Sequence, residues 1–317
     1  MKLPASNQCL LPPEIRGQAI VAFNIGADGS ACFVIAEEPL DYRSGSPQQA
    51  SFPKTMPDRP QRYRVVVLRG GEVELDVPIT DEPFNIHEVQ PLGDDLLLAC
   101  CRSYRRSKDD VDLNGRIYDR LGRFQSAICL GDGIETIQAS SSGDIWTSYF
   151  DEGVFGNFGW SEPLGASGLV AWRRDGTPAY RFEPTGEATE VADCYALNVV
   201  SDDEVWLYYY TDFQLVQLRH RAIEAVHVPN VQGSSAFAVS RNRSHALFVG
   251  GYSDHQSFEL VALAGGKRAP KRMTPLDLEG RPVEHLRAVG RGPSLYLLTA
   301  DHLFRYDVGD AVKWSIG

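Results

Sequence analysis

A group of four short apolar runs, separated by turn residues, recurs along the whole chain and limits the folds open to it. The first group contains AIVAFNI, ACFVIAE, RYRVVVL and EVELDVPI, all rich in the β-branched and aromatic residues that favour strands. Turn sequences such as Ala27-Asp28-Gly29 separate neighbouring runs. Hardly any segment has the 3.6-residue period of a helix, so the sequence predicts an all-β protein with very little helix.

We count six such groups, over approximately 17–80, 84–131, 133–184, 192–229, 233–274 and 283–317. A four-strand unit that repeats at this spacing is typical of a propeller blade. The chain therefore resembles the β-propeller superfamily and, at the level of fold, six-bladed NHL-like and lactonase-like propellers. The resemblance implies an all-β, six-bladed propeller of four-stranded antiparallel blades in a single domain, 1–317. A seven-bladed propeller, with two units merged in Gln18–Ile79, and a pair of β-sandwiches are the alternatives.

The last blade needs a fourth strand, because an open strand edge between the first and last blades would invite pairing with other chains. The tail AVKWSIG, Ala311–Gly317, has the alternation of a short outer strand. We therefore expect the tail to complete its own blade. The other possibility is that the N-terminal segment pairs into the last blade.

Composition excludes several classes of partner. The formal net charge is −11 and no long basic block occurs, which argues against nucleic acid. No stretch approaches the roughly 18 apolar residues of a membrane span, and the N-terminal segment lacks the apolar core of a secretory signal. The six cysteines have no zinc or CxxC spacing and indicate reduced structural thiols. We expect a cytoplasmic protein without a membrane partner, with a monomer favoured.

Long connections between the second and third strands of a blade, here called B–C connections, share one face of a propeller with the connections between blades. They are expected at about 38–61, 102–114 and 150–167, and functional residues concentrate in such long loops. The segment SYFDEGVFGNFGWSEPLGASGL, Ser148–Leu169, has neither strand alternation nor a helical period. It is either a ligand-binding loop that uses Asp151 and Glu152 beside Trp160, or a surface loop packed on its own aromatic residues.

Other candidate binding residues fall in B–C connections of the second, fourth and fifth blades. The arginines of the second blade could extend towards the loop that carries Asp151 and Glu152, or bind an anionic ligand. Alternatively, they could belong to a solvated loop whose own carboxylates neutralise them. The tyrosines and acidic residues could form a rim that suits a cationic peptide or a sugar, although packing explains tyrosines at strand ends equally. These candidates are Arg102, Arg105, Tyr210, Asp212, Tyr252 and His255.

Six-bladed calcium lactonases, such as the paraoxonase and gluconolactonase families, hold one metal with Glu, Asn and Asp side chains at the central channel. By fold position alone, the resemblance implies that Asn85, Glu135, Asp193 and Glu284 could bind Ca²⁺. Polar groups hydrated by channel water explain the same residues without metal, so no cofactor is predicted. Motifs of serine hydrolases, zinc proteases and nucleotide-binding enzymes are absent from the sequence.

The sequence therefore favours a binding propeller that recognises a protein or peptide partner through its B–C face. A calcium-dependent hydrolase or lactonase that uses the channel carboxylates is the enzyme alternative, and a carbohydrate-binding propeller is a further one. Propellers host all three activities, so the fold alone does not choose among them.

Overall fold

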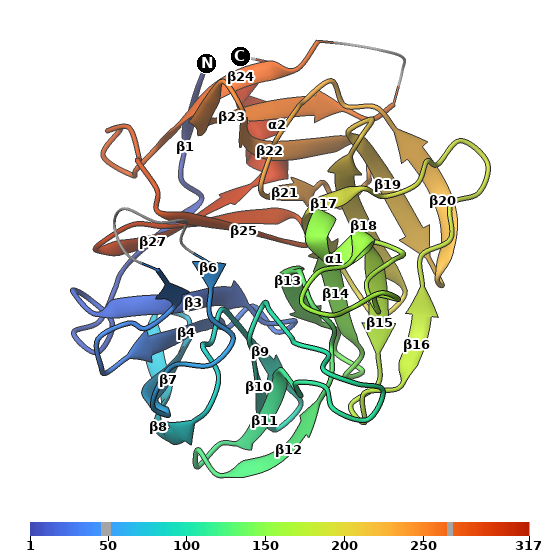
Figure 1. Ribbon diagram of the computed structural model, residues 1–317. Helices are drawn as coiled ribbons and strands as arrows, with labels where there is room; N and C mark the ends of the chain where they lie inside the picture. Colours follow the sequence, from blue (N-terminus) through green and yellow to red (C-terminus); the bar gives the residue numbers. More distant parts are fainter. Residues whose placement is uncertain (46–51, 265–268, 317) are drawn as a thin grey trace. The chain divides into compact units, whose positions relative to one another are not determined.

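The computed structural model of the protein describes residues 1–45, 52–264 and 269–316 (Figure 1). Six blades, each built on four antiparallel strands and one of them extended by a fifth, parallel strand, make the protein an all-β, six-bladed β-propeller, and the prediction from the repeat is confirmed. The extra length of the first group is a two-stranded hairpin inserted into blade 1, not a seventh blade.

The chain divides into two compact units. Unit 2 spans Pro12–Phe182 and contains blades 1 to 3, whereas unit 1 combines Met1–Leu11 with Glu183–Gly317 and contains blades 4 to 6. Each unit has its own buried apolar layers between neighbouring blades, such as the layer that joins Trp206 of blade 4 to Phe248 of blade 5. Burying one large apolar side chain in such a layer contributes about 1.5–3 kcal/mol.

The three blades of unit 2 follow one another along the chain. Blade 1 contains β3 (Ala19–Ile25), β4 (Ala31–Ala36), β7 (Gln61–Arg69) and β8 (Glu72–Glu82), with the inserted hairpin β5 (Arg43–Ser44) and β6 (Phe52–Pro53). Blade 2 contains β9 (Glu88–Leu92), β10 (Asp95–Ala99), β11 (Gly115–Asp119) and β12 (Phe124–Ile128). Blade 3 contains β13 (Ile134–Ala139), β14 (Ile145–Tyr149), β15 (Leu169–Trp172) and β16 (Pro178–Arg181).

Unit 1 contains the other three blades and both ends of the described chain. Blade 4 contains β17 (Asp193–Val199), β18 (Glu204–Tyr210), β19 (Gln214–Arg219) and β20 (Ala222–His227). Blade 5 contains β21 (Phe237–Val239), β22 (His245–Gly251), β23 (Asp254–Ala262) and β24 (Lys271–Leu276), extended by β1 (Lys2–Pro4). Blade 6 contains β25 (Arg287–Arg291), β26 (Ser294–Leu298), β27 (His302–Asp307) and β2 (Asn7–Leu10).

The N-terminal segment supplies the fourth strand of blade 6. Strand β2 pairs antiparallel with β27, with Asn7 opposite Arg305. Strand β1 pairs parallel with β24 (Figure 1). The prediction that the C-terminal tail forms this strand is wrong, because the tail forms helix α2 (Val308–Trp314) instead. Its residues Val308 and Ala311 are buried on one helical face, a spacing of i and i+3 that favours a helix over a strand.

A second departure from the predicted structure lies in the segment Ser148–Leu169. It contains the five-residue helix α1 (Asp151–Phe155), which starts with two acidic residues and ends at Gly156, where φ is +96°. Acidic residues in the first turn of a helix and a glycine directly after its last turn both stabilise helix ends. No helix within the described residues is long and apolar enough to cross a membrane.

Candidate functional site

The candidate binding residues gather into two groups, one in each unit. In unit 1, Tyr210 and Tyr252 contact two further aromatic residues, Tyr195 and Phe213, and we call these four residues the tyrosine cluster. In unit 2, the candidates surround the buried guanidinium of Arg102.

A β-bulge positions the first residue of the tyrosine cluster. Strands β17 and β18 pair Cys194 with Tyr209 and Ala196 with Tyr208, which leaves Tyr195 between them as the extra residue. A bulge locally kinks the strand and redirects its side chain. The inner strand of blade 3 has a β-bulge at the corresponding residue, Glu135. The same type of bulge therefore presents a carboxylate in blade 3 and the phenol of Tyr195 in blade 4.

The run of three tyrosines in β18 places its side chains in different surroundings. Tyr208 is fully buried in the layer between blades 4 and 5, and its hydroxyl donates to the Val231 carbonyl oxygen at 2.6 Å. Tyr209 lies on the opposite face of the strand, also buried, and its hydroxyl donates to Gln214 Oε1 at 2.7 Å. Tyr210 ends the strand and is 41% exposed. Two tyrosines therefore anchor the strand that presents the third.

Phe213 forms the base of the tyrosine cluster. It lies in the turn between β18 and β19 with φ of 51°, a left-handed conformation that is unfavourable for a bulky side chain. The ring is 9% exposed and packs against the rings of Tyr195, Tyr210 and Tyr252 at centroid distances of 5.9, 5.5 and 6.0 Å. These contacts offset the local backbone strain and fix the ring under its neighbours.

Tyr252 reaches the tyrosine cluster from the hairpin between β22 and β23. Its backbone N–H donates to the Gln232 carbonyl oxygen at 3.1 Å, and its ring lies directly against Gly233. A Cβ at residue 233, where φ is +74°, would come within 2.4 Å of the ring. The glycine therefore allows the close approach that holds Tyr252, whose side chain is 58% exposed on its other side.

The rings meet in both parallel and perpendicular pairs. Tyr195 stacks on Tyr210 at 6.4 Å with an interplanar angle of 13°, and it meets Tyr252 at 6.3 Å with an angle of 82°. The hydroxyl oxygens of Tyr195 and Tyr252 are 2.5 Å apart and hydrogen-bonded. Four aromatic residues from two blades therefore form one connected surface with two exposed members.

The surroundings of the tyrosine cluster are acidic. Burial raises the pKa of Tyr195, and the hydrogen bond to Tyr252 and the negative charge of Asp193 raise it further. Asp193 faces Tyr210 across the β17–β18 ladder, and Asp212 is exposed in the turn that precedes Phe213. The candidate His255 is exposed on β23 and lies near His285, whose pKa is lowered first by burial and then by His255.

A concavity of about 480 Å³ adjoins Tyr252. It is lined by the connection between blades 4 and 5, including Asn230 and Gln232, and by blade 5, where Arg272 Nε donates to Glu259 Oε1 at 2.8 Å. The concavity and the exposed face of Tyr252 therefore belong to one surface of unit 1.

In unit 2, Arg102 ties two B–C connections together. Arg102 is only 4% exposed. Its guanidinium donates hydrogen bonds to both carboxylate oxygens of Asp132, at 2.8 and 2.9 Å, and to Glu152. It also stacks over the ring of Phe158, 4.0 Å from the ring centroid. Burial acts to lower the pKa of Arg102, but Asp132 and Glu152 raise it overall. Burial raises the pKa of Asp132, with Arg102 opposing the rise. The arginine is held inside the protein as part of a buried ion pair.

The other candidates of unit 2 take different positions around this ion pair. Trp160 is 5% exposed and its Nε1 donates to the Ser103 carbonyl oxygen at 2.7 Å, while Arg105 stacks over the indole at 5.4 Å. Asp151 is exposed, and its carboxylate accepts the Glu152 backbone N–H at 2.7 Å. Asp151 and the 71%-exposed Phe155 are therefore among the residues of this loop that a partner could reach.

The four proposed calcium ligands are divided between the units. Asn85 and Glu135 belong to unit 2, and Asp193 and Glu284 belong to unit 1. Asn85 is buried, and its Nδ2 donates to the carbonyl oxygens of Asp41 and Lys54 at 2.8 and 3.0 Å, which anchors the inserted hairpin of blade 1. Within the described residues, no group of three or more His, Cys, Asp or Glu side chains could hold a metal ion. A calcium site on these residues stays a prediction.

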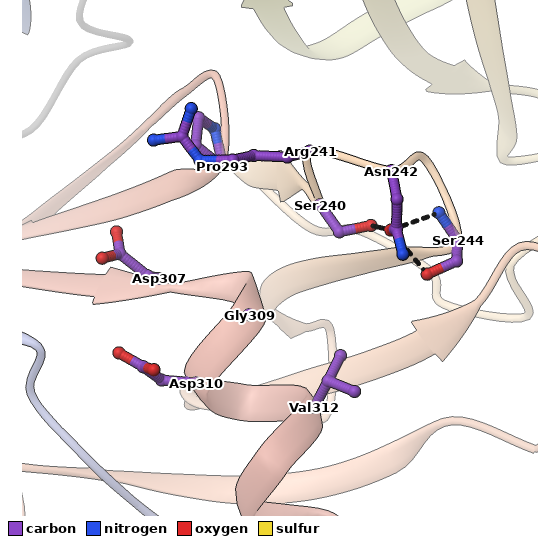
Figure 2. Close-up of a pocket in the computed structure, with 9 residues that line it drawn as sticks. All are labelled: Ser240, Arg241, Asn242, Ser244, Pro293, Asp307, Gly309, Asp310 and Val312. Atoms are coloured by element: carbon purple, nitrogen blue, oxygen red, sulfur yellow. Dashed lines mark hydrogen bonds between the residues drawn. The ribbon is translucent and has the colours of Figure 1, made fainter.

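Unit 1 has a second concavity, with a volume of about 490 Å³. Figure 2 shows the residues that line it. The concavity lies between the turn Ser240–Ser244 and the start of α2. Several polar side chains that line it form hydrogen bonds with neighbouring residues of the protein. Asn242 Oδ1 accepts the hydroxyls of Ser240 and Ser244, and Asp310 accepts the hydroxyl of Ser6 at 2.8 Å. These bonds brace the turn and the helix.

Two residues of the tyrosine cluster carried no clear signal in the sequence. Tyr195 falls within an ordinary strand pattern, and the bulge that redirects it depends on the pairing with β18. Phe213 precedes QLVQLR and is indistinguishable from the first residue of a strand. The dense run YYYTDF was the one available indication that several rings meet here.

Comparisons with known proteins match part of the chain to a family model and nearly all of it to a solved structure. The model of the YxzG family matches residues 184–306, a stretch that contains the tyrosine cluster and lies within unit 1. A search of curated proteins finds no match. Among solved structures, a chain from a structure described as "Crystal Structure of Mitotic Checkpoint Complex" is similar over 97% of this chain and 96% of its own length, with 8% identity and a TM-score of 0.48.

Proposed function

We propose that the protein is a binding propeller that recognises a protein or peptide partner, and that the tyrosine cluster beside the B–C connections of blades 4 and 5 is its contact surface. The observation that carries the proposal is the pair of exposed tyrosines, Tyr210 and Tyr252, held on a packed aromatic base. Tyrosine is enriched at binding hot spots because its ring gives a large contact area and its hydroxyl a hydrogen bond.

Rigidity supports the same proposal. Tyr210 ends a strand anchored by two buried tyrosines, and Tyr252 is held by Gly233 and by the hydroxyl of Tyr195. A side chain that is already ordered loses little conformational entropy when a partner binds, so more of the contact energy contributes to affinity. The neighbouring concavity of about 480 Å³ offers room for residues on either side of a contact at Tyr252.

A random peptide library displayed on phage tests the proposal, because it samples many sequences at once and does not require an identified partner. The immobilised full chain should enrich peptides whose binding falls at least about tenfold in the double variant Tyr210→Ser/Tyr252→Ser, the order of magnitude for losing hot-spot residues. The matched control is Leu121→Ser, which removes a side chain that is 67% exposed in unit 2. Enrichment of no peptide, or equal binding by the double variant, would exclude this surface as the contact site.

A further inference from the structure

We propose that the tyrosine cluster receives the cationic side chain of a lysine or arginine in an extended peptide. This inference rests on the proposed function and names the chemistry of the ligand. Three observations carry it: the arrangement of the rings, the absence of an internal cation over them among the described residues, and the acidic residues around them.

The rings are arranged to offer faces to a ligand. Tyr195 and Tyr210 are nearly parallel, whereas Tyr252 stands perpendicular to Tyr195 and to Phe213. A cation is attracted to the electron-rich face of an aromatic ring within about 6 Å of its centroid. Rings in two orientations on one surface allow a single cationic group to contact more than one face.

The two units differ in how they use aromatic faces. In unit 2, guanidinium groups of the chain itself cover exposed or half-buried rings, as Arg102 covers Phe158 at 4.0 Å and Arg116 covers Phe124 at 4.3 Å. Within the described residues, no lysine or arginine stacks on any of the four rings of the tyrosine cluster. The cluster therefore has aromatic faces that are available to a cation from another molecule.

The local charge favours the same ligand. Asp193 acts electrostatically on Tyr195, Asp212 lies exposed one residue before Phe213, and Asp254 follows Tyr252 by two residues. Arg272, the basic residue that lines the adjoining concavity, is paired with Glu259 and also acts electrostatically on Asp254. With a net charge of −11 on the whole chain, the long-range field also attracts cations and repels acidic or phosphorylated segments.

Matched peptides test the inference. Fluorescence anisotropy would compare a labelled Gly-Ser peptide that carries several lysines or arginines with peptides of equal length that carry glutamine or glutamate there. We expect the cationic peptides to bind at least about tenfold more tightly than the glutamine peptide and to weaken as salt is added. Tyr210→Leu and Tyr252→Leu, which keep apolar bulk but remove the aromatic face, should each reduce binding about threefold to tenfold.

The outcomes separate this inference from the proposed function. Asp212→Asn should weaken the cationic peptides alone, and Leu121→Ser should change nothing, with thermal unfolding to verify that each variant is folded. If the glutamine peptide binds equally well and still requires Tyr210 and Tyr252, the protein is a peptide binder and the cationic inference is wrong. Binding of a neutral oligosaccharide in place of every peptide would overturn both.

Discussion

The hydroxyl groups of Tyr195 and Tyr252, which come from different blades of unit 1, are hydrogen-bonded at 2.5 Å. The bond joins a residue of an inner strand to one of a B–C hairpin, 57 residues apart. It makes the exposed ring of Tyr252 part of the same rigid surface as the rings of blade 4.

A double-mutant cycle should detect this bond as an energetic coupling. Tyr195→Phe, Tyr252→Phe and the double variant keep all the rings and remove only the hydroxyls, and a hydrogen bond contributes about 1 kcal/mol. Urea unfolding of the four proteins should therefore give a coupling free energy of about 0.5–1 kcal/mol. Strictly additive losses would mean that the two hydroxyls do not bond in solution.

Gly233→Ala should displace Tyr252 although residue 233 is not itself a proposed contact. The new Cβ would lie 2.4 Å from the ring at a residue with φ of +74°, so we expect a loss of about 1–3 kcal/mol and weaker peptide binding. Gly280→Ala is the control, because its φ is +83° and nothing lies within 4 Å of the added Cβ. It should lower stability by about 1 kcal/mol and leave binding unchanged. Equal effects of the two variants would contradict the steric explanation.

Loss of Arg102 should cost far more than loss of an exposed arginine. Arg102→Ala leaves Asp132, itself 3% exposed, without its bidentate partner, and breaking a buried ion pair from one side costs about 3–5 kcal/mol. Arg123→Ala, which breaks an ion pair in which the arginine is 71% exposed, should cost at most about 1 kcal/mol. Chemical unfolding measures both, and limited proteolysis of the Arg102 variant should cleave first in the 150–168 loop. Similar losses in the two variants would contradict the buried ion pair.

The stability of unit 2 should depend on pH through Asp28. Burial acts to raise the pKa of this carboxyl group, but hydrogen bonds from Ser30 and from Arg69 lower it to about 2. The pKa of Asp28 in the folded protein thus lies below the unfolded value of 3.8. The ionised carboxylate therefore stabilises the fold fully above pH 3.8, and this stabilisation disappears as the pH falls through about 2. The stability difference between wild type and Asp28→Asn, about 0.5–1 kcal/mol for this half-exposed group, should shrink from pH 4 towards pH 2. A difference that stays constant over this range, followed by calorimetry, would contradict the assignment.

Cys32 should resist thiol reagents in the folded protein. It is fully buried in β4, and burial raises the pKa of its thiol to about 12, so almost no thiolate forms near neutral pH. Alkylation followed by peptide mapping should find Cys32 unmodified until the chain is unfolded, whereas the partly exposed Cys9 reacts earlier. Rapid labelling of Cys32 in the native protein would show that blade 1 opens readily.

The sequence predicted the blades well because each strand and turn is local information. Alternating apolar residues and turns such as Ala27-Asp28-Gly29 specify a hairpin without reference to the rest of the chain. Pairing between strands that are far apart in the chain is not encoded locally. Nothing in the sequence of Asn7–Leu10 identifies β27 as its pairing partner. The seven residues of α2 are too few for a helical period to outweigh an apparent alternation.

The tyrosine cluster was predictable in part for the same reason. Tyr210 ends a recognisable strand and Tyr252 directly follows another, so their common location could be inferred from propeller connectivity. Tyr195 depends on a bulge and Phe213 on a left-handed turn, and both arise only when the strands pair. In the Arg102 group, the sequence showed charges and aromatic residues together, but burial of the guanidinium followed from contacts with Asp132, a residue 30 positions away.

Because β2 pairs with β27, the strands of unit 1 become available for pairing at very different times during protein synthesis, whereas those of unit 2 are made one after another. Unit 2 is a continuous stretch, Pro12–Phe182, so all of its strands are translated before β24 and β27. Residues 1–11 emerge before unit 2, yet their partners β24 and β27 are made after it. Unit 1 therefore cannot close blade 6 until β27 has been translated, and until then the N-terminal strands are open to a wrong neighbour.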